Sequence, residues 1–350
     1  MALVGFGFGG SMFHAPFIAA EPRLELTSVV TQSPQRQSQV LARYPRTQIY
    51  QSVEDLFRDL DDVDLVVIST PNATHAAIAR EVLAGGRPVV VDKPVAPSVE
   101  EIRNLAALAK ATGTAIVPYQ NRRFDGDFRT VEALLVSGEL GVVHTFESRY
   151  ERWQPEVPKG PERSWKREPT PGTGVGILYD LGTHLIDQAV VLFGRPESVY
   201  AEVDIRRPDA AVDDDVFIAL EYQRGPRVHL WMSAVAADLG PRFRLLGSEA
   251  AYVKYGMDVQ ESALIAGRTP GEAGWGEEPA TSWGRIERGS ASTEVPTLSG
   301  AYSVFYTGIA EFLFDGAAPP VNIGDAVVTA EIIEAAARAA SSRAVVRLTS

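Results

Sequence analysis

The chain has 350 residues, which exceeds the length of one average domain and favours two domains. Hydrophobic residues make up 45% of it and charged residues 22%, which excludes a mainly disordered chain. The formal net charge of -12 argues against a nucleic-acid partner, because an acidic surface repels a phosphate backbone. Cysteine is absent, which excludes disulfides, thiolate nucleophiles and cysteine-ligated metal centres.

The sequence shows no pattern typical of a membrane or exported protein. Its apolar runs, such as residues 65–70, are far shorter than a membrane span. The N-terminal residues have neither a basic segment nor a small-residue cleavage site after an apolar stretch. We therefore expect a cytoplasmic protein that binds neither membrane nor nucleic acid.

Short apolar runs alternate with segments of helical spacing in the first third of the chain. This alternation predicts βαβ units and a doubly wound parallel sheet that is covered on both faces, with right-handed crossovers. Ser52 and Ser98 are predicted N-caps, and Gly85 and Gly113 are predicted C-caps. The predicted strands are 2–6, 24–30, 64–69, 88–93 and 114–119, and the predicted helices are 13–20, 36–44, 53–60, 73–83 and 99–111.

The pattern changes after residue 120, and we place a domain boundary there, giving an N-terminal domain over 1–120 and a second one over 121–350. Two stretches rich in Gly and Pro are expected to be long loops. Alternating runs between them predict an antiparallel sheet. The predicted helices are 124–136, 177–194, 301–314 and 325–341, the strands 142–153, 198–206, 214–222, 227–235 and 242–248, and the loops 155–176 and 267–300.

A glycine-rich turn follows the first predicted strand and opens the first helix. Its spacing is G-x-G-x-x-G, which in this context predicts a dinucleotide-binding loop. The first glycine permits a tight turn, the second lets the backbone approach a pyrophosphate, and the last allows close packing of helix on strand. The predicted contacts come from Gly5, Phe6, Gly7, Phe8, Gly9 and Gly10.

The end of the second predicted strand bears on the choice between NAD and NADP. An NAD site would place Asp or Glu there to bind the ribose 2′-OH. This chain has Thr31, Gln32 and Ser33 instead, followed by Arg36. Hydroxyls and a guanidinium suit a 2′-phosphate, so we favour NADP over NAD. The alternative is that Arg36 is an ordinary solvated helix residue.

Polar residues also follow two later strands, where ligands of open α/β sheets bind. Lys93 comes directly after a buried strand and precedes Pro94, so we expect partial burial that suits it to proton transfer. An exposed loop lysine is the alternative. We predict cofactor contacts at Thr70, Pro71, Asn72, His75, Asp92, Lys93 and Asn121.

Asp180 and His184 are four residues apart on a predicted helix, so they share one face. A carboxylate one turn from an imidazole can fix its tautomer and raise its basicity. An ordinary helix contact is the alternative, and a metal triad that adds Asp187 is a third, less favoured one. We therefore predict no metal.

Five motifs occur in order along the chain, namely GFGFGGSMFHAPFI, TPNATH, VDKPV, NRRFDGDF and YDLGTHLID. Together they resemble the glucose–fructose oxidoreductase, inositol dehydrogenase and MocA family, and within it the scyllo-inositol dehydrogenase subgroup, which tends to use NADP. The resemblance covers essentially the whole chain. Asp92 stands where the family more often has glutamate, and the short strand before Gly5 leaves open a start upstream of Met1.

The resemblance implies a Rossmann domain followed by an α+β domain with an open, mainly antiparallel sheet that forms homodimers or homotetramers. It implies an NAD(P)-dependent dehydrogenase that exchanges a hydride with a secondary alcohol or ketone of a cyclitol or sugar. The implied catalytic residues are Lys93, Asp180 and His184, with His184 as general base. Residues that could contact the polyol are Lys93, Asn121, Arg122, Tyr150, Trp153, Trp165, Tyr179, Asp180 and His184, although ordinary packing is an equal alternative for each aromatic one.

Two other functions stay open at this point. One is a dinucleotide-binding sensor without catalysis. The other is a glycosidase that uses the nicotinamide transiently and consumes none. A change in reduced-nicotinamide absorbance that is stoichiometric with product separates both from a dehydrogenase.

Overall fold

The protein is described here by a computed structural model, which covers residues 1–160, 164–169 and 172–348, without the side chains of residues 164 and 165. The chain forms two compact units. Unit 1 consists of residues 1–121, 261–275 and 301–327, and the remainder forms unit 2. A single division after residue 120 does not describe this arrangement, because two later segments return to unit 1.

Unit 1 contains a six-stranded parallel sheet in the order β3-β2-β1-β4-β5-β6, which confirms the predicted doubly wound Rossmann fold. The central strands are fully buried, as continuous apolar runs require. The sequence analysis missed β3, a three-residue edge strand in which Gln48 is exposed. The strands are β1 (Ala2–Val4), β2 (Ser28–Val30), β3 (Gln48–Tyr50), β4 (Val66–Ile68), β5 (Val89–Asp92) and β6 (Ile116–Tyr119).

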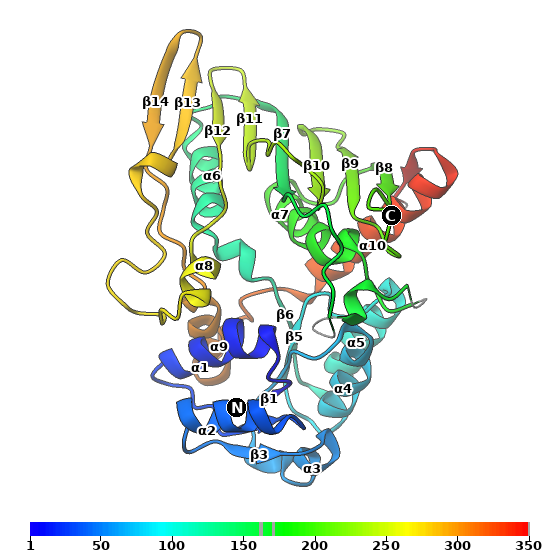
Figure 1. Ribbon diagram of the computed structural model, residues 1–350, viewed down its shortest axis with the longest axis vertical. Helices are drawn as coiled ribbons and strands as arrows, with labels where there is room; N and C mark the ends of the chain where they lie inside the picture. Colours follow the sequence, from blue (N-terminus) through cyan, green and yellow to red (C-terminus); the bar gives the residue numbers. More distant parts are fainter. Residues whose placement is uncertain (161–163, 170–171, 349–350) are drawn as a thin grey trace. The chain divides into compact units, whose positions relative to one another are not determined.

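Helices cover this sheet, with α4 and α5 side by side along one flank and α1 beside α9 along the other (Figure 1). The hydroxyls of Ser52 and Ser98 accept backbone N–H groups as predicted, and Gly85 and Gly113 are the C-caps. The helices are η1 (Gly10–His14, a π-helix), α1 (Ala15–Ala20), α2 (Pro34–Arg43), α3 (Val53–Arg58), η2 (Leu60–Asp62), α4 (Asn72–Ala84), α5 (Val99–Thr112), α8 (Gln260–Ile265) and α9 (Ser303–Asp315).

Unit 2 is built on a nine-stranded sheet in the order β14-β13-β12-β11-β7-β10-β9-β8-β15. It is mixed rather than purely antiparallel, because β7 and β10 run parallel while the other pairs are antiparallel. The strands are β7 (Val143–Glu151), β8 (Ser198–Asp204), β9 (Asp215–Glu221), β10 (Arg227–Ser233), β11 (Phe243–Gly247), β12 (Ala251–Lys254), β13 (Gly284–Arg288), β14 (Ala291–Val295) and β15 (Val346–Arg347).

The predicted loop over 267–300 is wrong in its second half. Residues 284–295 form the β13–β14 hairpin at the edge of the sheet (Figure 1). All but the last residue of β14 are exposed, so this strand lacks the apolar alternation by which strands are predicted. The short strands β12 and β15 were missed as well.

One face of this sheet packs against helices to form the core of unit 2. Met232 of β10, Phe128 of α6 and Leu185 of α7 are among its fully buried side chains. The predicted helix at 177–194 begins as a π-helix, so its first turn is wider than an α-helical one. The helices are η3 (Asn121–Phe124), α6 (Gly126–Ser137), η4 (Ser164–Arg167), η5 (Leu178–Gly182, a π-helix), α7 (Thr183–Phe193), η6 (Ala280–Ser282) and α10 (Ile323–Ser342), which begins in unit 1.

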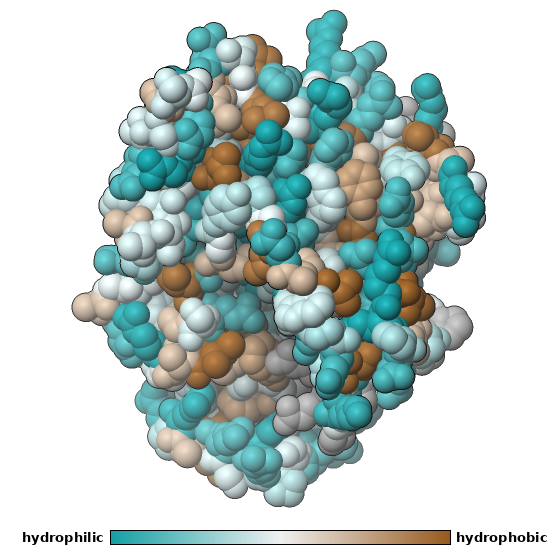
Figure 2. All heavy atoms as spheres, turned by 45° about the horizontal axis from the view of Figure 1, so that its top comes forward, coloured by the Kyte–Doolittle hydropathy of each residue, from teal (hydrophilic) through white to brown (hydrophobic). Residues whose placement is uncertain are grey.

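The surface carries apolar residues in small groups among hydrophilic ones on the face drawn in Figure 2. The large exposed apolar side chains come from different elements, such as Val136 of α6 and Trp153 after β7. No helix within the described ranges is long and apolar enough to cross a membrane.

Candidate functional site

The glycine loop of unit 1 has one side packed and one side open. Gly5 has a φ of 97°, and a Cβ there would collide with the carbonyl oxygen of Ser69. A Cβ on Gly10 would collide with the carbonyl oxygen of Gly5. Gly7, in contrast, would place a Cβ with no other atom within 4 Å. The packing therefore requires the first and last glycines, and the backbone at Gly7 is accessible to a ligand.

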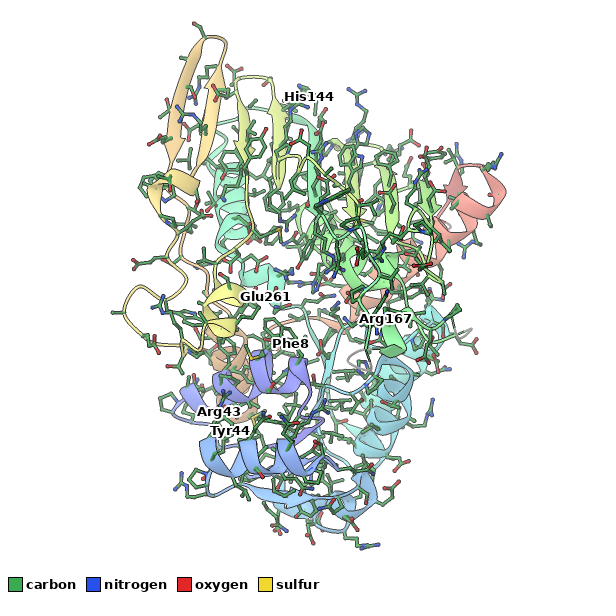
Figure 3. All side chains as sticks on the ribbon, in the orientation of Figure 1. Phe8, Arg43, Tyr44, His144, Arg167 and Glu261 are labelled. Carbon is green, nitrogen blue, oxygen red and sulfur yellow. The ribbon has the colours of Figure 1, made fainter. Side chains whose placement is uncertain are left out.

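The loop lies against the carboxyl ends of β4 and β5. A Cβ on Gly9 would come within 2.5 Å of Ser69 Oγ and 2.9 Å of Asp92 Oδ2. Phe6 is buried, and Phe8, labelled in Figure 3, makes an edge contact with Phe13. The predicted loop residues are thus gathered at the edge of the sheet where ligands of this fold bind.

The end of β2 presents hydroxyls and an arginine. Ser33 caps α2 by accepting the Arg36 N–H, and Arg36 is exposed on the first turn of that helix. Thr31 is buried, and its carbonyl oxygen accepts a hydrogen bond from the Gln37 side chain. Residues 31–36 include no carboxylate.

Asp92 is held at the end of β5 by three polar contacts. Its Oδ2 accepts the Ser69 hydroxyl at 3.0 Å, and its Oδ1 accepts the Lys93 N–H at 2.8 Å. His14 Nε2 lies 3.6 Å from Oδ2, so that interaction is mainly electrostatic. Burial raises the pKa of Asp92, but His14, His75 and Lys93 outweigh it and lower the pKa to about 2. Asp92 is therefore a carboxylate anion, with a side chain that is 22% exposed.

His14 and Tyr306 are functional candidates that sequence reasoning missed. His14 is fully buried in η1, and its Nδ1 lies 2.6 Å from the Tyr306 hydroxyl. Burial raises the pKa of Tyr306 well above its usual value, so the phenol keeps its proton and can donate it to Nδ1. Tyr306 is 292 residues away in sequence, which no local pattern could show.

Lys93 follows Asp92 directly, is half-buried, and precedes Pro94 through a cis peptide bond. The exposed-loop alternative for this lysine therefore does not hold. Asn121 is buried after β6, beside Gln120, which the sequence analysis did not consider. Gln120 Oε1 is buried and has no hydrogen-bond partner among the described residues. A buried acceptor of this kind requires a donor from a ligand or water.

The chain after β4 carries the remaining predicted contacts of unit 1. Asn72 is buried at the start of α4, and Pro71 precedes it as the N-cap residue. The Thr70 hydroxyl pairs with that of Thr74 at 2.7 Å. His75 is fully buried, and both of its ring nitrogens lie 2.8 Å from backbone carbonyl oxygens, those of Thr70 and Pro94.

In unit 2, Asp180 forms an ion pair with a residue outside the prediction. Lys166 Nζ donates to Asp180 Oδ1 at 2.6 Å, and both side chains are about 30% exposed or less. Lys166 lies in the segment predicted as a long loop. That segment has several basic residues, and nothing in the sequence indicates which of them pairs with Asp180. Asp213 binds the start of the π-helix by accepting the Leu178 N–H at 2.7 Å.

His184 is buried in the first turn of α7, and Asp187 is buried one turn later. Arg123 holds Asp187 through two hydrogen bonds of 2.6 and 2.7 Å. This bidentate pair occupies the carboxylate that a metal triad would need. In the described part of the chain, no three His, Asp or Glu side chains are grouped so as to hold a metal ion.

The predicted polyol contacts are only partly brought together. Arg122 donates to the Tyr150 hydroxyl at 2.8 Å, and its guanidinium lies over the tyrosine ring. Tyr179 is half-buried next to Asp180, whereas Trp153 is 58% exposed beyond β7. The side chain of Trp165 lies outside the described residues.

The donors and spaces of unit 1 fit a nicotinamide dinucleotide. The accessible backbone at Gly7 and the N-terminal turns of the helix that follows it suit a pyrophosphate. The exposed Arg36 suits a further phosphate. The orphaned acceptor of Gln120 suits an amide donor at the carboxyl end of the sheet.

Comparisons with known proteins agree with this geometry. Residues 1–119 match the family described as an oxidoreductase family with an NAD-binding Rossmann fold, and residues 128–253 match the GFO/IDH/MocA C-terminal domain. A scyllo-inositol 2-dehydrogenase (NADP(+)) of Bacillus subtilis is 33% identical over 99% of this chain and 95% of its own length.

Two further relatives extend over almost the whole chain. An uncharacterized oxidoreductase of Escherichia coli is 36% identical over 98% of this chain and 97% of its own. The crystal structure of an oxidoreductase from Bacillus cereus superposes with a TM-score of 0.88 at 30% identity, covering 100% of this chain and 98% of the other. The chain is therefore a member of the GFO/IDH/MocA family of oxidoreductases, with an NAD(P)-binding Rossmann domain.

Proposed function

We propose that the protein is an NADP-dependent dehydrogenase that interconverts a secondary alcohol and a ketone on a cyclitol or sugar. The observation that carries the proposal is the position of Lys93. It directly follows a carboxylate that lies against Gly9 of the dinucleotide loop, at the carboxyl end of the parallel sheet. A half-buried lysine at that position can donate a hydrogen bond to a carbinol oxygen presented to the nicotinamide.

The residues that would hold the dinucleotide are the glycine loop, the end of β2 and the chain after β4, β5 and β6. The open side of Gly7 suits the pyrophosphate. Thr31, Ser33 and Arg36 suit a 2′-phosphate, since they offer hydroxyls and a guanidinium without a carboxylate. The name of the B. subtilis relative, which states NADP(+), supports the same choice.

The proposed reaction transfers one hydride and one proton. When bound, the nicotinamide supplies or takes up the hydride of the carbinol carbon. Lys93 donates a hydrogen bond to the carbinol oxygen, and His184 takes the hydroxyl proton as general base. Asp180, which pairs with Lys166, would orient His184 or bind a neighbouring hydroxyl of the substrate. Asn121, Arg122, Tyr150 and Tyr179 are the proposed polyol contacts.

We also propose that the chain forms a dimer or tetramer of identical copies through the second face of the unit 2 sheet. Phe217, His229 and Trp231 form a half-buried aromatic stripe on that face, and Arg149 lies over the Trp231 ring at 3.9 Å. Glu147 pairs with Arg149, so charges of both signs flank the stripe. Such a face can complement a second copy of itself.

The glycine loop gives a prediction that separates binding from folding. Gly7→Ala is expected to leave the unfolding midpoint unchanged and to weaken dinucleotide binding by about tenfold, because its methyl group occupies the open side. Gly10→Ala is expected to lower the unfolding midpoint, since its Cβ collides with Gly5. Fluorescence titration and thermal unfolding measure the two effects, and unchanged binding by Gly7→Ala would contradict the site.

Arg36→Ala is expected to raise the KM for NADP by about tenfold and to leave the KM for NAD nearly unchanged. The reason is the loss of one charge-assisted contact with the 2′-phosphate. Arg43→Ala is the matched control, because Arg43 is exposed at the other end of α2 (Figure 3). Equal effects on the two cofactors would refute the proposed preference.

Lys93→Met and His184→Ala are each expected to lower the turnover rate by about 10²- to 10⁴-fold, the range for loss of one proton-transfer group. The assay follows reduced-nicotinamide absorbance on a panel of inositols, aldoses and keto-sugars, with NAD and NADP separately. Lys110→Met and His144→Ala are the matched controls, since both residues are exposed. The assignment fails if both test variants keep nearly the full rate on the best substrate.

The self-association is tested by light scattering. The wild-type chain is expected to run as a dimer or tetramer, and Trp231→Glu as a lighter species, because a charge replaces the centre of the stripe. Val136→Glu, on the exposed side of α6, should leave the mass unchanged. A monomeric wild-type chain at all concentrations tested would overturn the proposal.

A further inference from the structure

His75 lies between two segments that the proposed site uses. It is fully buried on the first turn of α4. Its Nε2 is 2.8 Å from the carbonyl oxygen of Thr70, which follows β4, and its Nδ1 is 2.8 Å from that of Pro94, which follows β5. Pro94 is the residue after Lys93, so the ring joins the chain after β4 to the turn that carries the lysine.

Each of the two contacts requires a hydrogen on the ring nitrogen that makes it. A carbonyl oxygen can only accept a hydrogen bond, and neutral imidazole has one N–H and one nitrogen with a lone pair. In a neutral His75, that lone pair would face a carbonyl oxygen at 2.8 Å without a proton between them, which is an unfavourable contact. In the imidazolium form both nitrogens donate, and the two hydrogen bonds are charge-assisted.

A buried cation needs a counter-charge nearby, and Asp92 provides it. Asp92 is ionised, and His75 is one of the groups whose positive field lowers the pKa of its carboxyl. Among the described residues, His14, Lys93, Tyr119 and Tyr306 also interact electrostatically with this carboxylate. The ionised Asp92 carboxylate therefore provides a negative charge close to His75.

We propose that His75 is a positioning residue for the reaction, held as an imidazolium that ties the carbonyls of Thr70 and Pro94 together and thereby fixes Lys93. The proposal rests on the proposed role of Lys93. His75 touches neither the carbinol nor the proton in transit, so it acts through the lysine. Positioning of this kind is effective because a shift of about 1 Å at a reacting group can reduce the rate by about 10²-fold.

The protonation state is tested on the wild-type chain by NMR of ring-¹⁵N histidine at pH 8, with the five histidines assigned through the backbone. His75 is expected to show two protonated ring nitrogens. His144 provides the comparison, since it is exposed on β7 (Figure 3) and its Nδ1 lies beside the Thr145 hydroxyl, which can donate as well as accept. A neutral-tautomer pattern at His75 would overturn the proposal, and this measurement needs no variant to fold.

The positioning role is tested by His75→Phe, which keeps a ring and removes both donors. Its kcat, counted per dinucleotide site titrated by fluorescence, is expected to fall by about 10- to 100-fold while the KM for the alcohol changes little. His75→Gln, whose amide nitrogen donates again, is expected to recover part of the rate. His144→Phe is the matched control and should keep the wild-type kcat.

The kinetic test and the NMR test can fail independently of each other. A wild-type kcat per site in His75→Phe would show that the ring only supports folding and would overturn the positioning role. If no alcohol or ketone is turned over by the wild-type chain, the proposed function fails. The NMR result still decides whether His75 is an imidazolium that binds the carbonyls of Thr70 and Pro94.

Discussion

The partly buried carboxylate of Asp92 is the constraint on which the candidate site of unit 1 depends. It binds the hydroxyl after β4 and the backbone N–H of Lys93, and it lies where a side chain on Gly9 would otherwise be. An ion in such a place is costly unless its lone pairs and its charge are matched. His14 of the π-helix η1 and His75 of α4 provide that match from two different helices. One charge thus links the loop, two strand ends and two helices.

This arrangement explains why Lys93 can be both half-buried and fixed. Its backbone N–H is bound to Asp92, and the next residue is bound through its carbonyl to His75. The turn is therefore held on both sides of the lysine. A pre-set donor of this kind needs little reorganisation when a substrate oxygen arrives, which is how a polar site gains its effect.

The sequence predicted what local chemistry determines and missed what distant contacts determine. The glycine loop, the buried strands and the caps at Ser52 and Ser98 depend on residues within one turn of each other, and the structure has them. The His14–Tyr306 contact, the Lys166–Asp180 pair and the return of residues 301–327 to unit 1 join parts of the chain that no periodicity connects. The β13–β14 hairpin was missed because exposed residues form it without an apolar alternation.

The two π-helices show how local geometry and function are connected. η1 follows the glycine loop and ends at His14, and η5 contains Asp180 and precedes His184. A π-turn inserts an extra residue, which changes the face on which the following side chains lie, and it is less favourable than an α-turn. Contacts outside the helix stabilise each turn, namely Tyr306 on His14 and Asp213 on the Leu178 N–H. The π-turns thus lie next to the candidate residues. Contacts from distant parts of the chain, rather than hydrogen bonds within the helix, offset the lower stability of these turns.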